Sequence, residues 1–203
     1  ALERAMVRSM GKCESIRNIV FHEYHNMGPK LRLLILADYI RKEYESALGN
    51  PSKEVDNLGV IPFFEQIRRQ AQAQGSPLRL GVLCGTVVIL PVQAKEALQV
   101  AGDPHFITEL VTKLFEAGHF QVLIGTKSLL GEGWDSPCIN ALILASFVGS
   151  YMLSNQMRGR AIRIFQKDPD KTSNIWHLVC VEPGGDPRES QDFQTLERRM
   201  EHF

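Results

Sequence analysis

Short runs of apolar residues, separated by stretches with helical periodicity, constrain the fold of this chain more than any other feature. Five of the runs lack a clear alternation of polar and apolar side chains: 31–37, 78–83, 121–125, 139–145 and 175–181. Runs of this kind are typical of parallel strands that are covered on both faces. We therefore expect an α/β fold in three layers, with a mainly parallel sheet and helices on both of its faces.

The segments between these runs give the expected helices. Residues 2–26 predict a helical segment with a break near Gly11, and Asp38 is placed to cap a helix over Tyr39–Leu48. The remaining expected elements are helices at Pro62–Gln74, at Pro104–Ala117, from Ser150 onward and at Glu189–His202, with an edge strand at Val87–Leu90.

The composition limits the classes of function. Acidic and basic side chains balance at 23 each, so any contact with nucleic acid must come from a local patch rather than from the overall charge. No run approaches the roughly 20 apolar residues of a membrane span. The four cysteines show no Cys-x-x-Cys spacing, which predicts reduced thiols in a cytoplasmic protein. The histidines show no paired-ligand spacing, so no metal site is assigned.

A strand end followed by a glycine-rich loop, residues 126–137, is the first candidate site. Ligands bind at the carboxyl ends of strands in open α/β sheets, and there the Thr126 hydroxyl and free backbone N–H groups suit a phosphate. Asp135 suits the hydroxyls of a ribose, and Trp134 either stacks on a base or packs beneath the loop. A plain turn between two strands, with Asp-Ser-Pro as its turn residues, explains the same segment equally well.

The pattern Gln-x-x-Gly-Arg-x-x-Arg at 156–163 is the second candidate. On a continuous helix, Gln156, Arg160 and Arg163 fall within about 60° of one another. One helix face then carries an amide and two guanidiniums, and Gly159 lets a neighbour approach closely. Guanidiniums present a fork of donors that suits phosphate oxygens. A solvated basic helix is the alternative interpretation.

Together, the two segments resemble motifs V and VI of superfamily 2 helicases and translocases, and the first is most similar to bacterial DEAD/DEAH-box helicase-family proteins. The resemblance runs from about residue 31 to about residue 181. It implies the second, C-terminal RecA-like domain at 31–181, led by a helical segment at 1–30 and followed by a helical extension at 182–203 that is truncated from a larger protein. One departure is the step of nine residues between Thr126 and Asp135, one more than in DEAD-box proteins.

The resemblance also implies roles for single residues. It assigns catalysis to Arg160, Arg163 and Gln156, ATP binding to Gly133, Asp135 and Gly159, and nucleic-acid binding to Thr126 and Lys127. The two arginines would be fingers on the γ-phosphate of ATP, and the glutamine would orient the attacking water or sense that phosphate. The segment Arg32–Arg41 takes the place of motif IV, where Arg41 or Lys42 either touches a backbone phosphate or lies on a solvated helix face.

Two further motifs of a phosphoryl-transfer site are absent from the sequence. There is no G-x-x-x-x-G-K-[ST], and no Asp-Glu-x-His or Asp-Glu-x-Asp run. Helicases of this superfamily keep these parts in the first RecA-like domain. We therefore expect half of a motor that uses ATP and Mg²⁺, with Mg²⁺ held chiefly by the missing domain, DNA or RNA as partner, and no ATPase activity alone. The alternatives are a duplex translocase of a restriction or remodelling system and a non-catalytic RecA-like interaction module.

Overall fold

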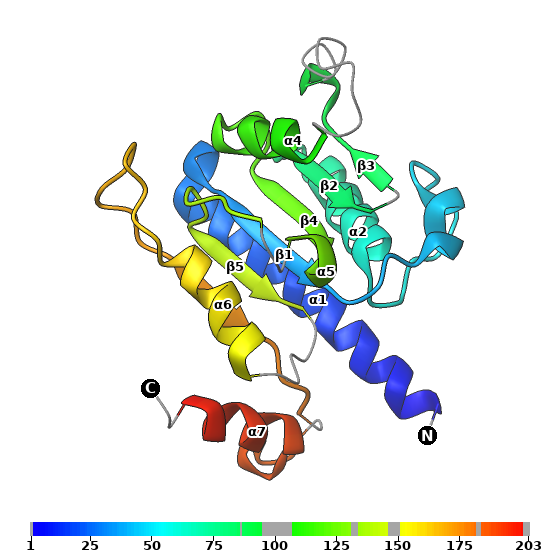
Figure 1. The fold of residues 1–203 in the computed structure, drawn as a ribbon. Coiled ribbons are helices and arrows are strands. Elements are labelled where there is room, and N and C mark those ends of the chain that lie inside the picture. Colours follow the sequence, from blue (N-terminus) through cyan, green and yellow to red (C-terminus); the bar gives the residue numbers. More distant parts are fainter. Residues whose placement is uncertain are drawn as a thin grey trace.

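The structure, a computed structural model, describes residues 2–85, 87–94, 107–130, 134–145, 151–181 and 184–200, except for the side chains of residues 2–9, 151–154 and 199. Within these residues, six strands form one sheet in the order β3-β2-β4-β1-β5-β6 (Figure 1). The strands are β1 (Leu33–Ala37), β2 (Leu80–Cys84), β3 (Val87–Ile89), β4 (Val122–Thr126), β5 (Ala141–Leu144) and β6 (Asn174–His177). Every neighbouring pair is parallel except β2 and β3.

Both faces of the sheet are covered by helices. The helices α1 (Leu2–Met27) and α2 (Val60–Ala73) pack on one face, and α4 (Ile107–Glu116) and α6 (Tyr151–Ala161) pack on the other (Figure 1). The side chains of β1 alternate between two cores, because successive residues of a strand point to opposite faces. Leu33 and Ile35 join the core beneath α1 and α2, whereas Leu34 and Leu36 join the core beneath α4 and α6. The three-layer α/β expectation is confirmed.

The structure also describes several further helical elements. They are the 3₁₀ helices η1 (Gly28–Lys30), η2 (Lys42–Ala47), η3 (Val92–Ala94) and η5 (Pro187–Glu189), the single turn α5 (Lys127–Leu130) and the terminal helix α7 (Gln191–Met200). The strand β3 pairs antiparallel at the edge of the sheet, as the sequence predicts for Val87–Leu90.

Two predictions about helices are wrong. Residues 39–48 do not form an α-helix: they contain only η2, because Arg41 has a left-handed backbone with φ of 62°. Asp38 does not cap a helix there. Conversely, α1 continues through Gly11 without a break. A single glycine costs a helix only about 0.5–1 kcal/mol, and the following side chains Cys13, Ile16 and Val20 are buried in the core.

Some element ends also differ from the predictions. The helix α6 ends at Ala161, before Arg163, and β6 ends at His177, four residues earlier than expected. The starts predicted at Pro104 and Ser150, and the end predicted at His202, lie outside the described residues. None of the helices within the described ranges is long and apolar enough to cross a membrane.

A buried carboxylate ties the first helix to the last strand. Glu23 of α1 is fully buried and accepts hydrogen bonds from Asn174 Nδ2 at 3.0 Å and from Trp176 Nε1 at 2.7 Å. Burial of a charged group is expensive unless hydrogen bonds satisfy it. These hydrogen bonds thereby join α1, which precedes the two motifs in the sequence, to β6, which follows them.

Candidate functional site

The carboxyl ends of β1 and β4 form the edge at which the first candidate segment lies. The strands are in register, with Ala37 beside Thr126, so the next residues along, Asp38 and Lys127, are also neighbours. Lys127 Nζ forms an ion pair with Asp38 Oδ1. Lys127, a predicted nucleic-acid contact, therefore has a fixed side chain at this edge and neutralises the carboxylate there.

Thr126 is the last residue of β4, as the sequence predicts. Its side chain is 5% exposed. Its Oγ1 accepts a hydrogen bond from Ser128 Oγ at 3.2 Å, which leaves the Thr126 hydroxyl hydrogen free to act as a donor. Ser128 is exposed and was not singled out by the sequence, because an isolated serine in a loop carries no signal.

A close approach at Gly125 sets the direction of the chain after β4. A Cβ on Gly125 would lie 2.3 Å from Leu130 Cδ1 and 2.5 Å from the carbonyl oxygen of Leu83. Only glycine leaves room for α5 to fold back over the strand end. This single helical turn, which the sequence did not predict, presents the Leu130 carbonyl group to α6.

Arg160 and Arg163 of the second candidate segment both contact the first candidate segment. Arg160 Nη1 donates to the carbonyl oxygen of Leu130 at 2.5 Å. Arg163 Nη1 donates to Asp135 Oδ2 at 2.6 Å, in an ion pair whose side chains are 54% and 53% exposed. Arg163 lies in the turn after α6 rather than on it, but its N–H still bonds the Arg160 carbonyl at 3.4 Å. The fold thus gathers Arg160, Arg163 and Asp135 on one surface.

The other predicted site residues stand apart from this group. Gln156 lies on α6 with an exposed side chain. A Cβ on Gly159 would meet nothing within 4 Å, so no described part of this chain makes the close approach that the sequence suggested. Gly133 lies outside the described residues.

A lysine and a serine hold the carboxyl end of α6 in place. Lys171 Nζ donates to the carbonyl oxygens of Ala161 at 2.7 Å and Ile139 at 2.6 Å. Ser173 Oγ, which has a single hydrogen to donate, lies within hydrogen-bonding distance of the same two oxygens. Burial lowers the pKa of the Lys171 ammonium from its ordinary value of 10.5. This clamp fixes the turn that carries Arg163. The sequence gives no local signal for this clamp, because the carbonyl groups that Lys171 and Ser173 contact lie 10 to 34 residues away.

The choice between stacking and packing for Trp134 is settled by its environment. Trp134 is 7% exposed within the core beneath α4 and α6, and its Nε1 donates to Thr112 Oγ1 at 2.7 Å. It therefore packs in the core rather than presenting its ring for stacking. Nearby, burial raises the pKa of the Cys138 thiol to about 11, which keeps it protonated and unreactive. The part of the chain that the structure describes contains no cluster of His, Cys, Asp or Glu that could hold a metal ion.

Comparison with solved structures assigns the fold. The chain is similar to the C-terminal part of the Fun30 ATPase domain, with a TM-score of 0.50 and 14% identity, over 85% of this chain and 42% of that one. Weaker similarities relate it to the Pyrococcus furiosus Hef helicase domain (TM-score 0.48, 16% identity, 92% of this chain, 28% of that one) and to S. cerevisiae Dbp5 bound to RNA and ADP BeF3 (0.49, 14%, 92% and 36%). The chain spans less than half of each of these proteins. The sequence matches no known protein family and no curated protein.

The fold is therefore the RecA-like fold of helicase-type ATPase domains. At 14% identity the similarity extends to the fold alone, so the activity must be argued from the site residues.

Proposed function

We propose that this chain is the C-terminal RecA-like domain of an ATP-dependent superfamily 2 helicase of the DEAD/DEAH-box type, joined in its full-length protein to a first RecA-like domain. One observation carries the proposal: Arg160 and Arg163 both bond to the segment that follows β4, to Leu130 and to Asp135. A merely solvated basic helix needs no such contacts. Their convergence supports one nucleotide-facing surface built from both motifs.

The chemistry of this surface suits one half of an ATP site. ATP would bind between the two domains, with Mg²⁺ held chiefly by the first domain. Arg160 and Arg163 donate hydrogen bonds to the γ-phosphate oxygens and stabilise the charge that develops there. Arginine fingers of this kind are worth about 10³ to 10⁵ in rate. Gln156 orients the attacking water, and Asp135 accepts from the ribose hydroxyls once Arg163 turns to the phosphates.

The adjoining strand end supplies the nucleic-acid contact. Thr126 and Lys127 sit at the carboxyl edge of the sheet, and on this proposal they bind phosphates of a DNA or RNA strand. Contacts to phosphates position a strand without reading its sequence. Because the arginines bond to the segment that leaves this strand, closure of the two domains on ATP would also move the bound nucleic acid.

Substitution of the arginines in the full-length protein tests the proposal. We expect Arg160→Ala or Arg163→Ala to lower kcat by at least about 10²-fold, since each removes a donor that acts on transition-state charge. The apparent affinity for ATP should change less. Lysine at either position should restore little activity, because an ammonium lacks the bidentate fork. The measurement is steady-state ATPase with and without single-stranded and duplex DNA and RNA.

Arg158→Ala is the matched control on the same helix, about 160° around the axis from Arg160. It should retain near-normal kcat. Equal damage from Arg158→Ala and Arg160→Ala would mean that the loss reflects helix charge or stability, and the finger role would be wrong. Stimulation by duplex without strand separation would favour the duplex translocase, and a full-length protein without any ATPase activity would favour the interaction module.

A further inference from the structure

The segment that leaves β1 presents an exposed aromatic ring on a fixed backbone. Tyr39 follows Asp38 at the carboxyl edge of the sheet, and its side chain is 61% exposed. Its backbone is held by the start of α2, where Val60 N–H donates to the Tyr39 carbonyl oxygen at 2.9 Å and Ile61 N–H donates to that of Ile40 at 3.3 Å. An exposed ring on a rigid support is preorganised to bind a flat partner.

Arg41 holds the ring from within the same segment. Its guanidinium carbon lies 5.1 Å from the centroid of the Tyr39 ring, and its Nε donates to the Leu58 carbonyl oxygen at 3.3 Å. The left-handed backbone of Arg41, with φ of 62°, is rare for a residue other than glycine. Gly59 makes room for it, because a Cβ there would lie 2.4 Å from Arg41 Cγ. The chain maintains an unfavourable conformation that places a cation against an exposed ring.

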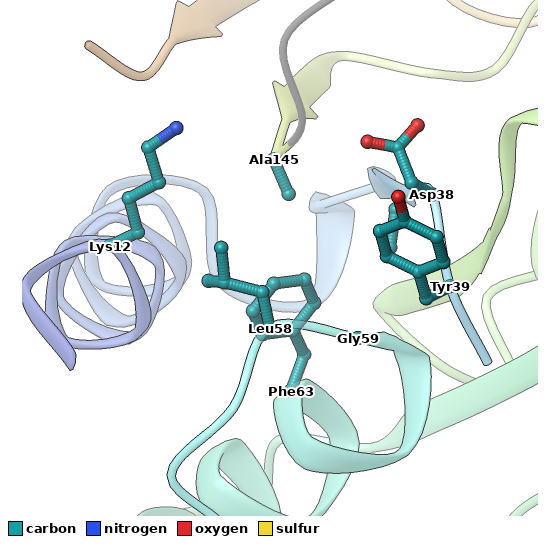
Figure 2. A pocket seen from close by; sticks show the side chains of 8 residues that line it. Lys12, Asp38, Tyr39, Leu58, Gly59, Phe63 and Ala145 are labelled. Atoms are coloured by element: carbon teal, nitrogen blue, oxygen red, sulfur yellow. The ribbon is translucent and has the colours of Figure 1, made fainter. Parts of the chain in front are cut away.

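The Tyr39 ring lines one side of a pocket, and the cationic side chain of Lys12 lines the opposite side (Figure 2). The pocket has a volume of about 110 Å³ and is lined by Lys12 of α1, by Asp38 and Tyr39, and by the apolar side chains of Leu58, Phe63 and Ala145. Figure 2 shows Lys12 on one side of the pocket and Asp38 with Tyr39 on the other. The Asp38 carboxylate is paired with Lys127, so it repels an approaching phosphate less than a free carboxylate would.

The segment that carries the ring follows the strand beside the proposed phosphate contact. Ala37 is the register partner of Thr126, and neighbouring strands lie about 4.8 Å apart. Tyr39 is two residues beyond Ala37. A strand whose backbone passes Thr126 would therefore carry its bases within reach of an aromatic face and its next phosphates toward Lys12 and Arg41.

We propose that Tyr39, held by Arg41, stacks on a base of a single-stranded nucleic acid bound along this edge. The inference rests on the proposed function and adds to it a site of base contact. Stacking on an aromatic side chain tolerates every base, because each has a π-face. The platform therefore gives affinity for unpaired strands without sequence preference, and it distinguishes a single strand from a duplex, whose bases are already stacked.

The test compares variants of the full-length protein on matched oligonucleotides by fluorescence anisotropy. Tyr39→Ala should weaken binding of a single-stranded oligonucleotide by about 5- to 150-fold, the effect of losing one stacked base. Tyr39→Phe retains the ring and should bind within about twofold of the unaltered protein. Val92→Ala, which truncates a side chain on η3 that is 80% exposed, is the control for loss of exposed apolar surface. The thermal midpoint of Tyr39→Ala should be unchanged.

Abasic substitutions, scanned along the oligonucleotide, identify the base. At one position the missing base should weaken binding by the unaltered protein and cause no further loss with Tyr39→Ala. Two results would overturn the inference. In the first, every abasic position weakens binding by Tyr39→Ala as much as binding by the unaltered protein. In the second, Tyr39→Ala binds the intact oligonucleotide as tightly as the unaltered protein does. A weakened affinity for ATP alone would reassign the ring to the nucleotide and also overturn it. If the unaltered full-length protein binds no nucleic acid, the proposed function itself fails.

Discussion

Arg163 and Asp135 form an ion pair in which both side chains are about half exposed. Pairs of this kind contribute roughly 0–1 kcal/mol to stability. Arg163 can therefore exchange Asp135 for a phosphate at little cost. Arg160 differs, because it holds a neutral carbonyl group, and a guanidinium bonds more strongly to an anionic phosphate oxygen than to a carbonyl oxygen. Both contacts hold the arginines in place and are weak enough to be exchanged for contacts with a phosphate.

Substitution of Gly159 by alanine should raise the stability of this chain but lower the activity of the full-length protein. Nothing lies within 4 Å of its Cβ position, and glycine inside a helix costs about 0.5–1 kcal/mol relative to alanine. Gly159→Ala should therefore raise the unfolding free energy of this chain by about that amount, measured by urea titration. In the full-length protein, where the resemblance assigns Gly159 to ATP binding, the added methyl group should obstruct the close approach of a neighbour and lower kcat.

Gly11→Ala is the matched control for this prediction. Gly11 also lies inside a helix, with nothing within 4 Å of its Cβ position. It should stabilise the chain similarly and leave kcat unchanged. If Gly159→Ala left kcat unchanged as well, the close approach suggested by the sequence would not occur on either side of the cleft.

At the scale of elements, the apolar runs predicted the strands well and the local signals predicted some helices poorly. A central strand such as 31–37 is covered on both faces, so nearly all of its side chains must be apolar. This requirement is visible in the local sequence, whatever the position of the strand in the sheet. The failure at 39–48 has a different cause: the left-handed Arg41 depends on Gly59, eighteen residues away. The Lys171 clamp and the ion pair of Lys127 with Asp38 are also tertiary contacts. Local sequence patterns therefore singled out the arginines of the candidate site but not the contacts that hold them, and the role of these arginines stays a prediction.

A buried carboxylate inside α2 predicts how stability depends on pH. Glu65 is fully buried. Burial acts to raise its pKa, but hydrogen bonds from Arg68, Arg69 and the Gly49 N–H outweigh burial and lower the pKa below its ordinary 4.5. The folded state thus binds a proton less readily than the unfolded state. The stabilisation is present above about pH 4.5 and is lost as pH falls through the lower folded-state pKa.

Glu65→Gln tests this dependence. At neutral pH it should lower the unfolding free energy by about 2 kcal/mol, less than for a fully buried pair because the arginines are 31% and 25% exposed. The difference from the unaltered chain should shrink as pH falls below about 4.5 in urea titrations. Glu109→Gln, in the exposed pair with Lys113, should show little effect at any pH. A difference for Glu65→Gln that stayed constant with pH would contradict the assignment.

At the scale of the whole molecule, the proposed site is divided between two domains. On the proposed function, this chain would supply donors for the outer phosphate and contacts for a nucleic-acid strand. Its net charge of zero implies that nucleic acid would be held by that edge rather than by a general field. The sequence contains neither the motif that carries a phosphate-binding lysine nor the motif that carries magnesium-binding carboxylates. Phosphoryl transfer needs the lysine, the metal and a positioned water in addition to arginine fingers.

The 203-residue chain should therefore show no ATP turnover above background and should bind ATP weakly, since positioning by one half of the cleft provides little of the catalytic effect. The measurement is phosphate release across the fractions of a size-exclusion column. Adding the first RecA-like domain as a separate chain should restore turnover, because it completes the cleft, and Arg160→Ala in this chain should abolish the restored activity. Turnover that follows the chain alone through the column would overturn the divided site. Restored turnover that is insensitive to Arg160→Ala would instead mean that the first domain hydrolyses ATP without the arginines of this chain.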